Sequence, residues 1–253
     1  MLKIKADGII LGDYVEIDET SGVITEVFDR KSRFIRPNIA NVDCINVVIS
    51  YSPKPDFVAV DKLIVACVKA GAKFIITLNK GETDSKLFDK IQEEYSGIAD
   101  GVFLTSCKTG EGIDKLKEYL KGKLVAFAGQ SAVGKTSLIN AISGLNLKTG
   151  DLSKKTERGK QTTTVSQIIS CADFEIADTP GFSIIKNEIK PEELTLFYPE
   201  FVDPSKQCYY RGCVHINEPD CCVKEYLSEG KIPKGRYDRY IEIYKELKEA
   251  KRV

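Results

Sequence analysis

The segment Gly-Gln-Ser-Ala-Val-Gly-Lys-Thr at residues 129–136 constrains the fold of this chain more than any other feature. It satisfies the pattern G-x-x-x-x-G-K-[ST], and it lies between an apolar run at 124–128 and a helical pattern at 135–143. In such a strand–loop–helix, the glycines let backbone N–H groups surround phosphates, and the helix N-terminus adds partial positive charge. The sequence therefore predicts a phosphate-binding loop in an α/β domain.

The chemistry of this loop assigns roles to particular side chains. We expect Lys135 to neutralise the β- and γ-phosphates and the Thr136 hydroxyl to bind Mg²⁺. Asp178 follows an apolar run at 174–177 and begins Asp-Thr-Pro-Gly, in which Asp178 can support the Mg²⁺ and the Gly181 N–H can contact a γ-phosphate. Alone, this tetrapeptide is better explained as an ordinary turn. After a phosphate loop, it indicates a second part of the same nucleotide site. The predicted phosphate-side residues are Gly129, Gln130, Ser131, Ala132, Val133, Gly134, Lys135, Thr136, Ser137, Asp178 and Gly181.

Two further motifs follow apolar runs and indicate a guanine site. Asn79-Lys80-Gly-Glu82 follows the run at 73–78, and Ser106-Cys107-Lys108 follows the run at 101–105. A carboxylate can accept both N–H groups on one edge of guanine, and a lysine stem can stack on the ring. The usual motifs are N-K-x-D and S-A-K, so Glu82 and Cys107 are departures. Glu is longer than Asp by about 1.5 Å, which keeps the chemistry and alters the geometry.

The order of the motifs is unusual. Ordinary GTPases have the phosphate loop first and the base-reading motifs last, whereas here the base-reading motifs come first. The same sheet cut at another place gives this order, so we predict a circularly permuted P-loop GTPase domain of the α/β class. Its expected strands are at 44–50, 73–78, 101–105, 124–128 and 174–177, and its expected helices at 61–69, 84–95, 113–120 and 135–143.

Different patterns flank this domain. Short alternating runs around Tyr14 to Ile17 and Gly22 to Val27 predict a small β-domain, with turns at Gly12-Asp13 and Ser21-Gly22. Near the C-terminus, Tyr237, Tyr240, Ile241, Tyr244 and Leu247 are spaced for one face of a helix. We expect domains at 1–36, 37–195 and 196–253.

Four potential metal ligands lie close together in the third region. Cys208, Cys213, His215 and Cys221 supply three thiolates and an imidazole, and His215 is the only histidine of the chain. A Cys₃His set is typical of a closed, structural zinc site, so we expect one Zn²⁺ per chain. The spacing alone leaves Cys222 as an alternative to Cys221. Three other cysteines lie in apolar stretches and are expected to be buried: Cys44, Cys67 and Cys171.

Composition excludes several classes of protein. No apolar run approaches the ~20 residues of a membrane span, and the N-terminus lacks a secretory pattern. Lys plus Arg equals Asp plus Glu at 37 each, so nucleic-acid binding would need local basic clusters. Candidates are Arg30, Lys31, Arg33 and Arg36, and Lys231, Lys234 and Arg236. We expect a cytoplasmic monomer with reduced thiols.

Together these features resemble the RsgA/YjeQ family, the small-ribosomal-subunit-dependent, circularly permuted GTPases. The resemblance includes Gly12-Asp13, residues 35–43 (Ile-Arg-Pro-Asn-Ile-Ala-Asn-Val-Asp), residues 129–137, 159–164 and 178–182, and the zinc spacing. It implies a cytoplasmic protein that binds the small subunit and its rRNA and hydrolyses GTP to GDP with Mg²⁺ during late ribosome assembly. It also implies an N-terminal OB-like barrel, although the 36 residues before the junction are too few for a complete one.

The resemblance also implies catalytic residues in the first switch. The family has Gly-Lys/Arg-His-Thr-Thr-Thr, and this chain has Gln161 in place of the histidine. We expect Gln161 to orient the attacking water, Lys135 to stabilise charge, and Thr163, chosen among three consecutive threonines, to bind Mg²⁺. Alternatively, Gln161 only solvates a loop. Two other functions stay open at this point: a GTP-latched RNA-binding module without hydrolysis, and a P-loop ATPase with relaxed base selectivity.

Overall fold

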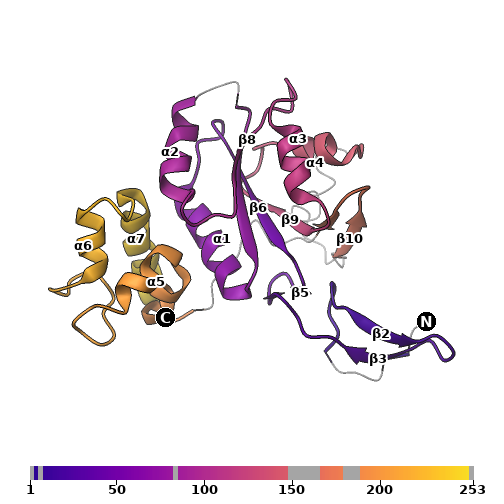
Figure 1. Cartoon of the computed structure of the whole chain (residues 1–253), viewed down its shortest axis with the longest axis horizontal. Helices are drawn as coiled ribbons and strands as arrows, with labels where there is room; N and C mark the ends of the chain where they lie inside the picture. Colours follow the sequence, from indigo (N-terminus) through magenta and orange to yellow (C-terminus); the bar gives the residue numbers. More distant parts are fainter. Residues whose placement is uncertain (1–2, 5–7, 82–84, 148–165, 179–188, 251–253) are drawn as a thin grey trace.

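The computed structural model describes residues 3–4, 8–81, 85–147, 166–178 and 189–250. A central sheet carries helices on both faces, a small β-rich part precedes it, and a group of helices follows it (Figure 1). No helix within these residues has the length and apolar character to cross a membrane.

The central sheet has six strands in the order β10-β11-β9-β6-β7-β8. All neighbouring strands run parallel except β10 and β11. Counted from β9 as the first strand, the order becomes 2-3-1-4-5-6, so a cut ahead of the phosphate-loop strand would restore a continuous numbering. The strands are β6 (Cys44–Ser50), β7 (Lys73–Asn79), β8 (Val102–Leu104), β9 (Leu124–Ala128), β10 (Gln167–Ser170) and β11 (Glu175–Asp178).

Side-chain alternation along β6 explains why helices cover both faces of the sheet. Ile45, Val47 and Ile49 pack beneath α1 (Phe57–Ala70) and α2 (Ser85–Tyr95), whereas Cys44 and Val48 point toward α3 (Ile113–Leu120) and α4 (Lys135–Ser143). A strand that is buried on both faces is apolar at nearly every position. This is the pattern from which the strand at 44–50 was predicted.

Helix α1 is longer than the sequence pattern predicts. Its first turn begins at Phe57 and not at Asp61, because the Asp56 carboxylate accepts a 3.0 Å hydrogen bond from the Ala59 N–H and caps the helix. The helix ends at Ala70, and the following Gly71 caps it with a φ of 74°.

The C-terminal helices pack against the outer side of α1. They are η1 (Pro191–Phe197), α5 (Pro199–Ser205), α6 (Cys222–Ser228) and α7 (Lys234–Ala250). Val65 of α1 joins their apolar cluster, which contains the aromatic side chains of Tyr198, Phe201 and Tyr240. Helix α1 therefore lies between the sheet and the C-terminal helices (Figure 1).

The N-terminal part contains two small sheets. A three-stranded sheet has the order β1-β3-β2, and a two-stranded hairpin connects it to β6. Asn41, which is buried, joins this part to the rest: its Nδ2 donates to the Gly12 carbonyl, and its Oδ1 accepts from the Lys31 N–H. The strands are β1 (Lys3–Ile4), β2 (Val15–Asp18), β3 (Val23–Val27), β4 (Arg33–Phe34) and β5 (Ile39–Ala40).

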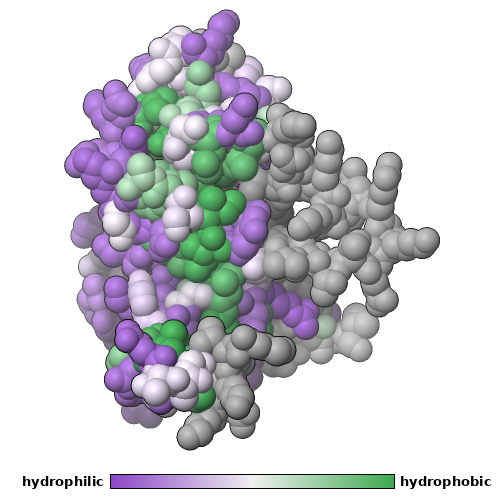
Figure 2. Space-filling model, turned by 90° about the vertical axis from the view of Figure 1, so that its right-hand side faces the viewer, coloured by the Kyte–Doolittle hydropathy of each residue, from purple (hydrophilic) through white to green (hydrophobic). Residues whose placement is uncertain are grey.

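One face of the molecule carries a band of apolar residues. Figure 2 views the side on which α3, α4 and β10 lie in Figure 1, and the band runs between hydrophilic residues there. Half-buried Leu145, Leu147 and Ile169 pack against the α3–α4 side of the sheet. The apolar core beneath α3 and α4 therefore reaches the surface on this side.

Candidate functional site: the phosphate loop and the cysteine cluster

The predicted motifs meet at one edge of the central sheet. Parallel strands β7, β8, β9 and β11 all end at this edge, and each is followed by a predicted site segment. The phosphate loop leaves β9 between β11 and β6, where the chain direction across the sheet reverses. Such a switch point is where open α/β sheets bind ligands.

Close approaches explain the two glycines of the phosphate loop. A Cβ on Gly129 would lie 2.2 Å from the Val48 carbonyl oxygen, and a Cβ on Gly134 would lie 2.4 Å from Asn79 Nδ2. Both glycines also have a positive φ, 131° and 92°. Ala132 has a φ of 64°, a left-handed conformation that is strained for a residue with a Cβ atom and that glycine adopts without this strain.

Lys135 is held at the mouth of the loop. Its Nζ donates to the carbonyls of Gly129 at 2.8 Å and Gln130 at 2.7 Å. An ammonium group has three N–H donors, so a third remains for an oxygen in the loop. Burial lowers the pKa of Lys135 below its ordinary value, which an anionic ligand would counteract.

Asn79 ties the base-reading motifs to the phosphate loop. The residue is 2% exposed, and its Nδ2 donates to the Val133 carbonyl at 3.1 Å. Its Oδ1 accepts from Thr105 Oγ1 at 3.4 Å and from Cys107 Sγ at 3.5 Å. Cys107, which stands where the usual motif has alanine, thus supplies a weak hydrogen-bond donor to Asn79.

Lys80 and Ser106 also lie within this arrangement. Lys80 Nζ donates to the carbonyls of Ser52 and Ala132, at 2.8 and 3.0 Å, so its stem crosses from β7 to the phosphate loop. Ser106 is buried, and its Oγ accepts from the Thr109 N–H at 3.2 Å. Lys108 is exposed at the rim.

The structure describes some of the remaining residues that were predicted to bind the nucleotide, and not others. Thr136 and Asp178 are half-buried, and Asp178 Oδ2 accepts from Gln167 Nε2 at 3.3 Å. Ser131 and Ser137 are exposed. Four predicted residues lie outside the described part of the chain: Glu82, Gln161, Thr163 and Gly181.

The four predicted metal ligands converge on one point. Their donor atoms all lie within 4.8 Å of one another. His215 Nδ1 is 3.3 Å from the sulfurs of Cys213 and Cys221 and 3.6 Å from that of Cys208. Ligands in a tetrahedron around Zn²⁺ are about 3.5 to 3.8 Å apart, given Zn–S and Zn–N bonds of about 2.3 and 2.0 Å. The cluster could therefore hold a metal ion of this kind.

The surroundings fix this cluster and exclude Cys222 from it. Tyr237 and Tyr240 of α7 donate from their hydroxyls to the carbonyls of His215 and Val214, at 2.7 and 3.1 Å. Cys222 Sγ instead donates to the Gln207 carbonyl. Burial raises the pKa of Cys213 to about 12, so in the absence of a cation this thiol stays protonated.

The structure corrects one of the predicted basic clusters. Arg236 is fully buried and paired with Asp61 and Glu200, so it is not part of a nucleic-acid surface. Lys231 and Lys234 are exposed but paired with Glu229 and Asp238. The local sequence predicted a cationic patch because it does not contain the acidic partners of Arg236. These partners, Asp61 and Glu200, lie far from it in the sequence.

Cys171 is also less buried than predicted, because it follows the edge strand β10, whereas Cys44 and Cys67 are buried. The sequence analysis missed the side chain of Gln130, whose Oε1 accepts from the Asp56 N–H at 3.1 Å and whose Nε2 donates to the Lys54 carbonyl at 3.3 Å. No local pattern indicates this contact, since a glutamine inside a phosphate loop is compatible with many partners.

Residues 27–188 match the model of the RsgA GTPase family. The protein "Small ribosomal subunit biogenesis GTPase RsgA" of Thermotoga maritima is 42% identical in an alignment 251 positions long that covers 94% of this chain and 84% of the relative. The protein of the same name from Geobacillus sp. (strain WCH70) is 40% identical in an alignment 253 positions long, with 96% of this chain and 86% of the relative covered.

Two solved structures resemble the whole arrangement. YjeQ from Thermotoga maritima superimposes with a TM-score of 0.82 at 38% identity, covering 97% of this chain and 89% of that structure. YloQ, described as a circularly permuted GTPase, has a TM-score of 0.77 at 32% identity, with 97% and 83% covered. With the phosphate loop and the base-reading motifs in the same fold, these matches show that the chain is a GTPase and belongs to the RsgA family.

Proposed function

We propose that this GTPase binds the small ribosomal subunit and hydrolyses GTP there during late assembly, in the cytosol. The observation that carries the proposal is the match to RsgA proteins, named for small-subunit biogenesis, over nearly all of the chain. A match confined to the nucleotide site would support GTP hydrolysis alone. Here it extends to the parts that flank the GTPase domain.

For the nucleotide, we propose that Lys135 and the amides of residues 129–137 bind the phosphates. The third N–H of Lys135 supports this role, because the other two already hold the ammonium group in place. We propose that Asn79, Lys80, Glu82 and the loop of Ser106, Cys107 and Lys108 select guanine. The contacts of Asn79 and Lys80 with the phosphate loop support this assignment, since they fix the base-reading residues relative to the phosphates.

For hydrolysis, we propose that Thr136 and Thr163 bind Mg²⁺ and that Asp178 supports the ion without binding it directly. When bound, Mg²⁺ would neutralise charge between the β- and γ-phosphates. Gln161 would orient the attacking water and Gly181 would contact the γ-phosphate. The position of Asp178 at the end of β11, beside the strand of the phosphate loop, supports its role.

For the C-terminal part, we propose one structural Zn²⁺ on Cys208, Cys213, His215 and Cys221. Four protein ligands leave no open position, so the ion would stabilise the loop and not take part in hydrolysis. The Cys222 contact with the Gln207 carbonyl favours Cys221 as the fourth ligand.

For the N-terminal part, we propose a shortened OB-like domain over about residues 1–36 that contacts rRNA. The side chains of Lys31, Arg33 and Arg36 are exposed on the hairpin that leads into the GTPase domain at 37–195. Arg30 is excluded from this contact surface, because it is held by Asp13. The zinc-binding helical domain would occupy residues 196–253.

Binding of the full chain to purified small and large ribosomal subunits tests the proposal. With a non-hydrolysable GTP analogue, we expect saturable binding to small subunits and none to large subunits. The variant Lys31→Glu/Arg33→Glu/Arg36→Glu should weaken it, with Lys231→Glu as the matched control. A flat binding curve on small subunits would refute the proposed partner.

A further inference from the structure

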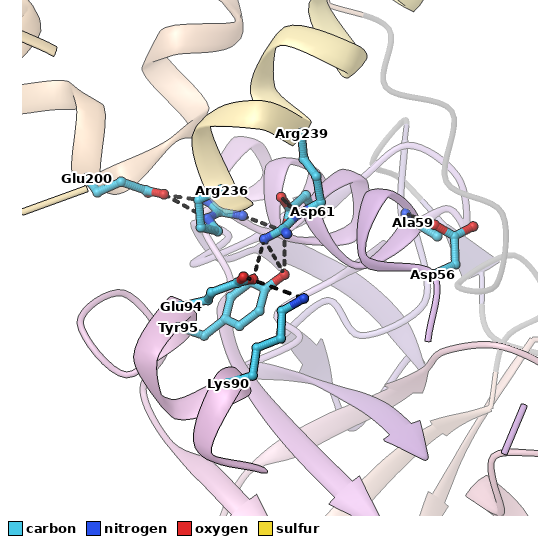
Figure 3. A network of polar contacts seen from close by, with 9 residues as sticks. All are labelled: Asp56, Ala59, Asp61, Lys90, Glu94, Tyr95, Glu200, Arg236 and Arg239. Carbon is cyan, nitrogen blue, oxygen red and sulfur yellow. Dashed lines mark hydrogen bonds and ion pairs between the residues drawn. The ribbon is translucent and has the colours of Figure 1, made fainter. Parts of the chain in front are cut away.

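A buried ionic cluster joins the C-terminal helix α7 to helices α1 and α2 (Figure 3). Arg239 donates from Nε to Asp61 at 2.6 Å, and from Nη2 to Glu94 at 2.7 Å and to the Tyr95 hydroxyl at 3.0 Å. The Tyr95 hydroxyl in turn donates to Asp61 at 2.8 Å. The side chains of Arg239, Asp61 and Glu94 are at most 10% exposed, and Tyr95 is buried. Water therefore does not screen the charges of this cluster.

Arg236 extends the cluster to α5. Its Nη1 forms a 2.6 Å ion pair with Asp61 that lacks hydrogen-bond alignment, and its Nε donates to Glu200 at 2.7 Å. Its guanidinium also lies 4.4 Å from the centre of the Tyr198 ring. Asp61 is thus the point on α1 at which both arginines of α7 are held.

The N-terminus of the same helix, close to Asp61, contacts the phosphate loop. Gln130 holds Lys54 and Asp56 through the two hydrogen bonds of its side-chain amide, and Asp56 caps α1. A small cavity lined by Val48, Val60, Leu63 and Gln130 lies beneath this contact. The amide of Gln130 is therefore a direct polar link between the phosphate loop and the start of α1, and Figure 3 shows Asp56 at the start of the helix that carries Asp61.

Helix α7 continues the connection to the cysteine cluster. Arg236 and Arg239 flank Tyr237, whose hydroxyl holds the His215 carbonyl at 2.7 Å. Tyr240, one residue further, holds the Val214 carbonyl. Contacts at hydrogen-bond distance thus run from the phosphate loop through α1 and α7 to the cysteine-rich loop.

We propose that the N-terminal half of helix α1 couples the phosphate loop to the C-terminal domain, with Gln130 as the positioning residue at the Asp56 cap and the Asp61 cluster in the second turn. A bound nucleotide orders the loop that carries Gln130, and this order stabilises the docking of α7. Linkage makes the effect reciprocal, so an intact Asp61 cluster raises nucleotide affinity. The route is separate from the covalent connection that follows β11, and it requires GTP or GDP binding but no ribosome.

A double-mutant cycle on GDP affinity tests this coupling in the full, zinc-loaded chain. Arg239→Gln should raise the GDP Kd by about 5-fold or more, the lower bound of typical coupling between sites. In the Gln130→Ala background, the same substitution should change the Kd less than twofold. The matched control is Lys62→Ala, which breaks an exposed ion pair with Glu246 between the same two helices and should leave the Kd unchanged.

Hydrogen exchange gives a second measurement. In the parent chain, GDP should slow exchange in α7 and in residues 208–222, and Gln130→Ala should abolish this slowing while GDP is saturating. If Arg239→Gln does not fold, Tyr95→Phe takes its place in the cycle, since it removes one hydroxyl from the same cluster.

Two results would overturn the proposal. In one, the folded cluster variant binds GDP like the parent, and GDP slows no exchange in α7. In the other, the full effect of the cluster variant persists in the Gln130→Ala background, which would place the coupling in another route.

Discussion

Arg239 Nε donates a 2.6 Å hydrogen bond to Asp61 Oδ2 across 178 positions of sequence. The neighbouring residue on α1, Lys62, pairs with Glu246 of the same partner helix, but both of these side chains are exposed, 33% and 47%. Two adjacent residues thus make a buried and an exposed ionic contact between the same pair of helices. Their energetic consequences should differ because only one pair is screened by water.

Asp61→Asn should destabilise the protein strongly. It removes the carboxylate that Arg236 and Arg239 share and leaves each arginine with one carboxylate partner, Glu200 or Glu94; breaking such a buried ion pair costs about 3–5 kcal/mol. Lys62→Ala should cost less than about 1 kcal/mol. Urea denaturation followed by tyrosine fluorescence compares the two. Equal losses for both variants would contradict the burial argument.

The Asp61 contact also marks the limit of prediction from sequence. The strand at 44–50 and the helices at 113–120 and 135–143 were predicted with the bounds observed, because each carries its own periodicity and boundary signals. Arg236 was wrongly predicted as a surface cation, because its burial depends on an acidic residue in another part of the fold. Likewise, the first turn of α1 was missed because its cap, Asp56, follows two prolines typical of a loop.

The functional site, like the fold, could be predicted from the sequence only in part. The motif residues around Asn79 and Lys135 could be predicted because backbone geometry and phosphate chemistry require particular residue types at fixed spacing. The contacts among them could not. Gln130 with Lys54, and Lys80 with Ser52, depend on which strand ends lie side by side, and this follows from the sheet order.

Acid should weaken the junction of the N-terminal part through Asp13. Hydrogen bonds from Arg30, and from the Ile10 N–H, hold the pKa of Asp13 below its ordinary 3.8. A carboxyl with a lowered folded-state pKa contributes stability above the unfolded value and loses it as the pH falls through the folded value. The stability difference between the parent and Asp13→Asn should therefore be complete at neutral pH and shrink below about pH 4. Urea titrations at several pH values measure it, and a difference independent of pH would contradict the role of the ionised carboxylate.

Guanine nucleotides should bind far more tightly than adenine nucleotides. If Glu82 accepts both N–H groups of guanine, each charged hydrogen bond adds about 1.5–3 kcal/mol, so GDP should bind well over ~10-fold tighter than ADP. Glu82→Ala should remove most of this preference, and Glu82→Asp should retain it. Competition titrations decide the point, and equal affinity of the parent for ADP and GDP would refute the guanine assignment.

One tightly bound zinc ion per chain is expected. Elemental analysis of protein purified without chelators should give one equivalent, and Cys213→Ser should reduce it, whereas Cys222→Ser should not. Removing the metal should unfold the loop at 208–222, since ligand binding there is coupled to folding. Hydrogen exchange of that segment before and after chelation provides the measurement, and protein that contains no zinc would count against the site.

Gln161 should matter for hydrolysis and not for binding. A side-chain amide can accept a hydrogen bond from the attacking water and donate to a phosphate oxygen. Gln161→Ala should therefore lower the stimulated hydrolysis rate by ~10²-fold or more with nearly unchanged GTP affinity, the signature of a transition-state interaction. Gln161→His should restore much of the rate. Parental turnover by Gln161→Ala would mean that another group places the water.

Single-turnover GTP hydrolysis shows whether this GTPase works on the small ribosomal subunit. The rate should be measured for the full chain alone, with purified small subunits and with purified large subunits. We predict stimulation of about 10³-fold or more by small subunits, as groups supplied in trans give to other GTPases, and none by large subunits. An identical rate with and without small subunits, or equal stimulation by small and large subunits, would contradict the proposed action on the small subunit.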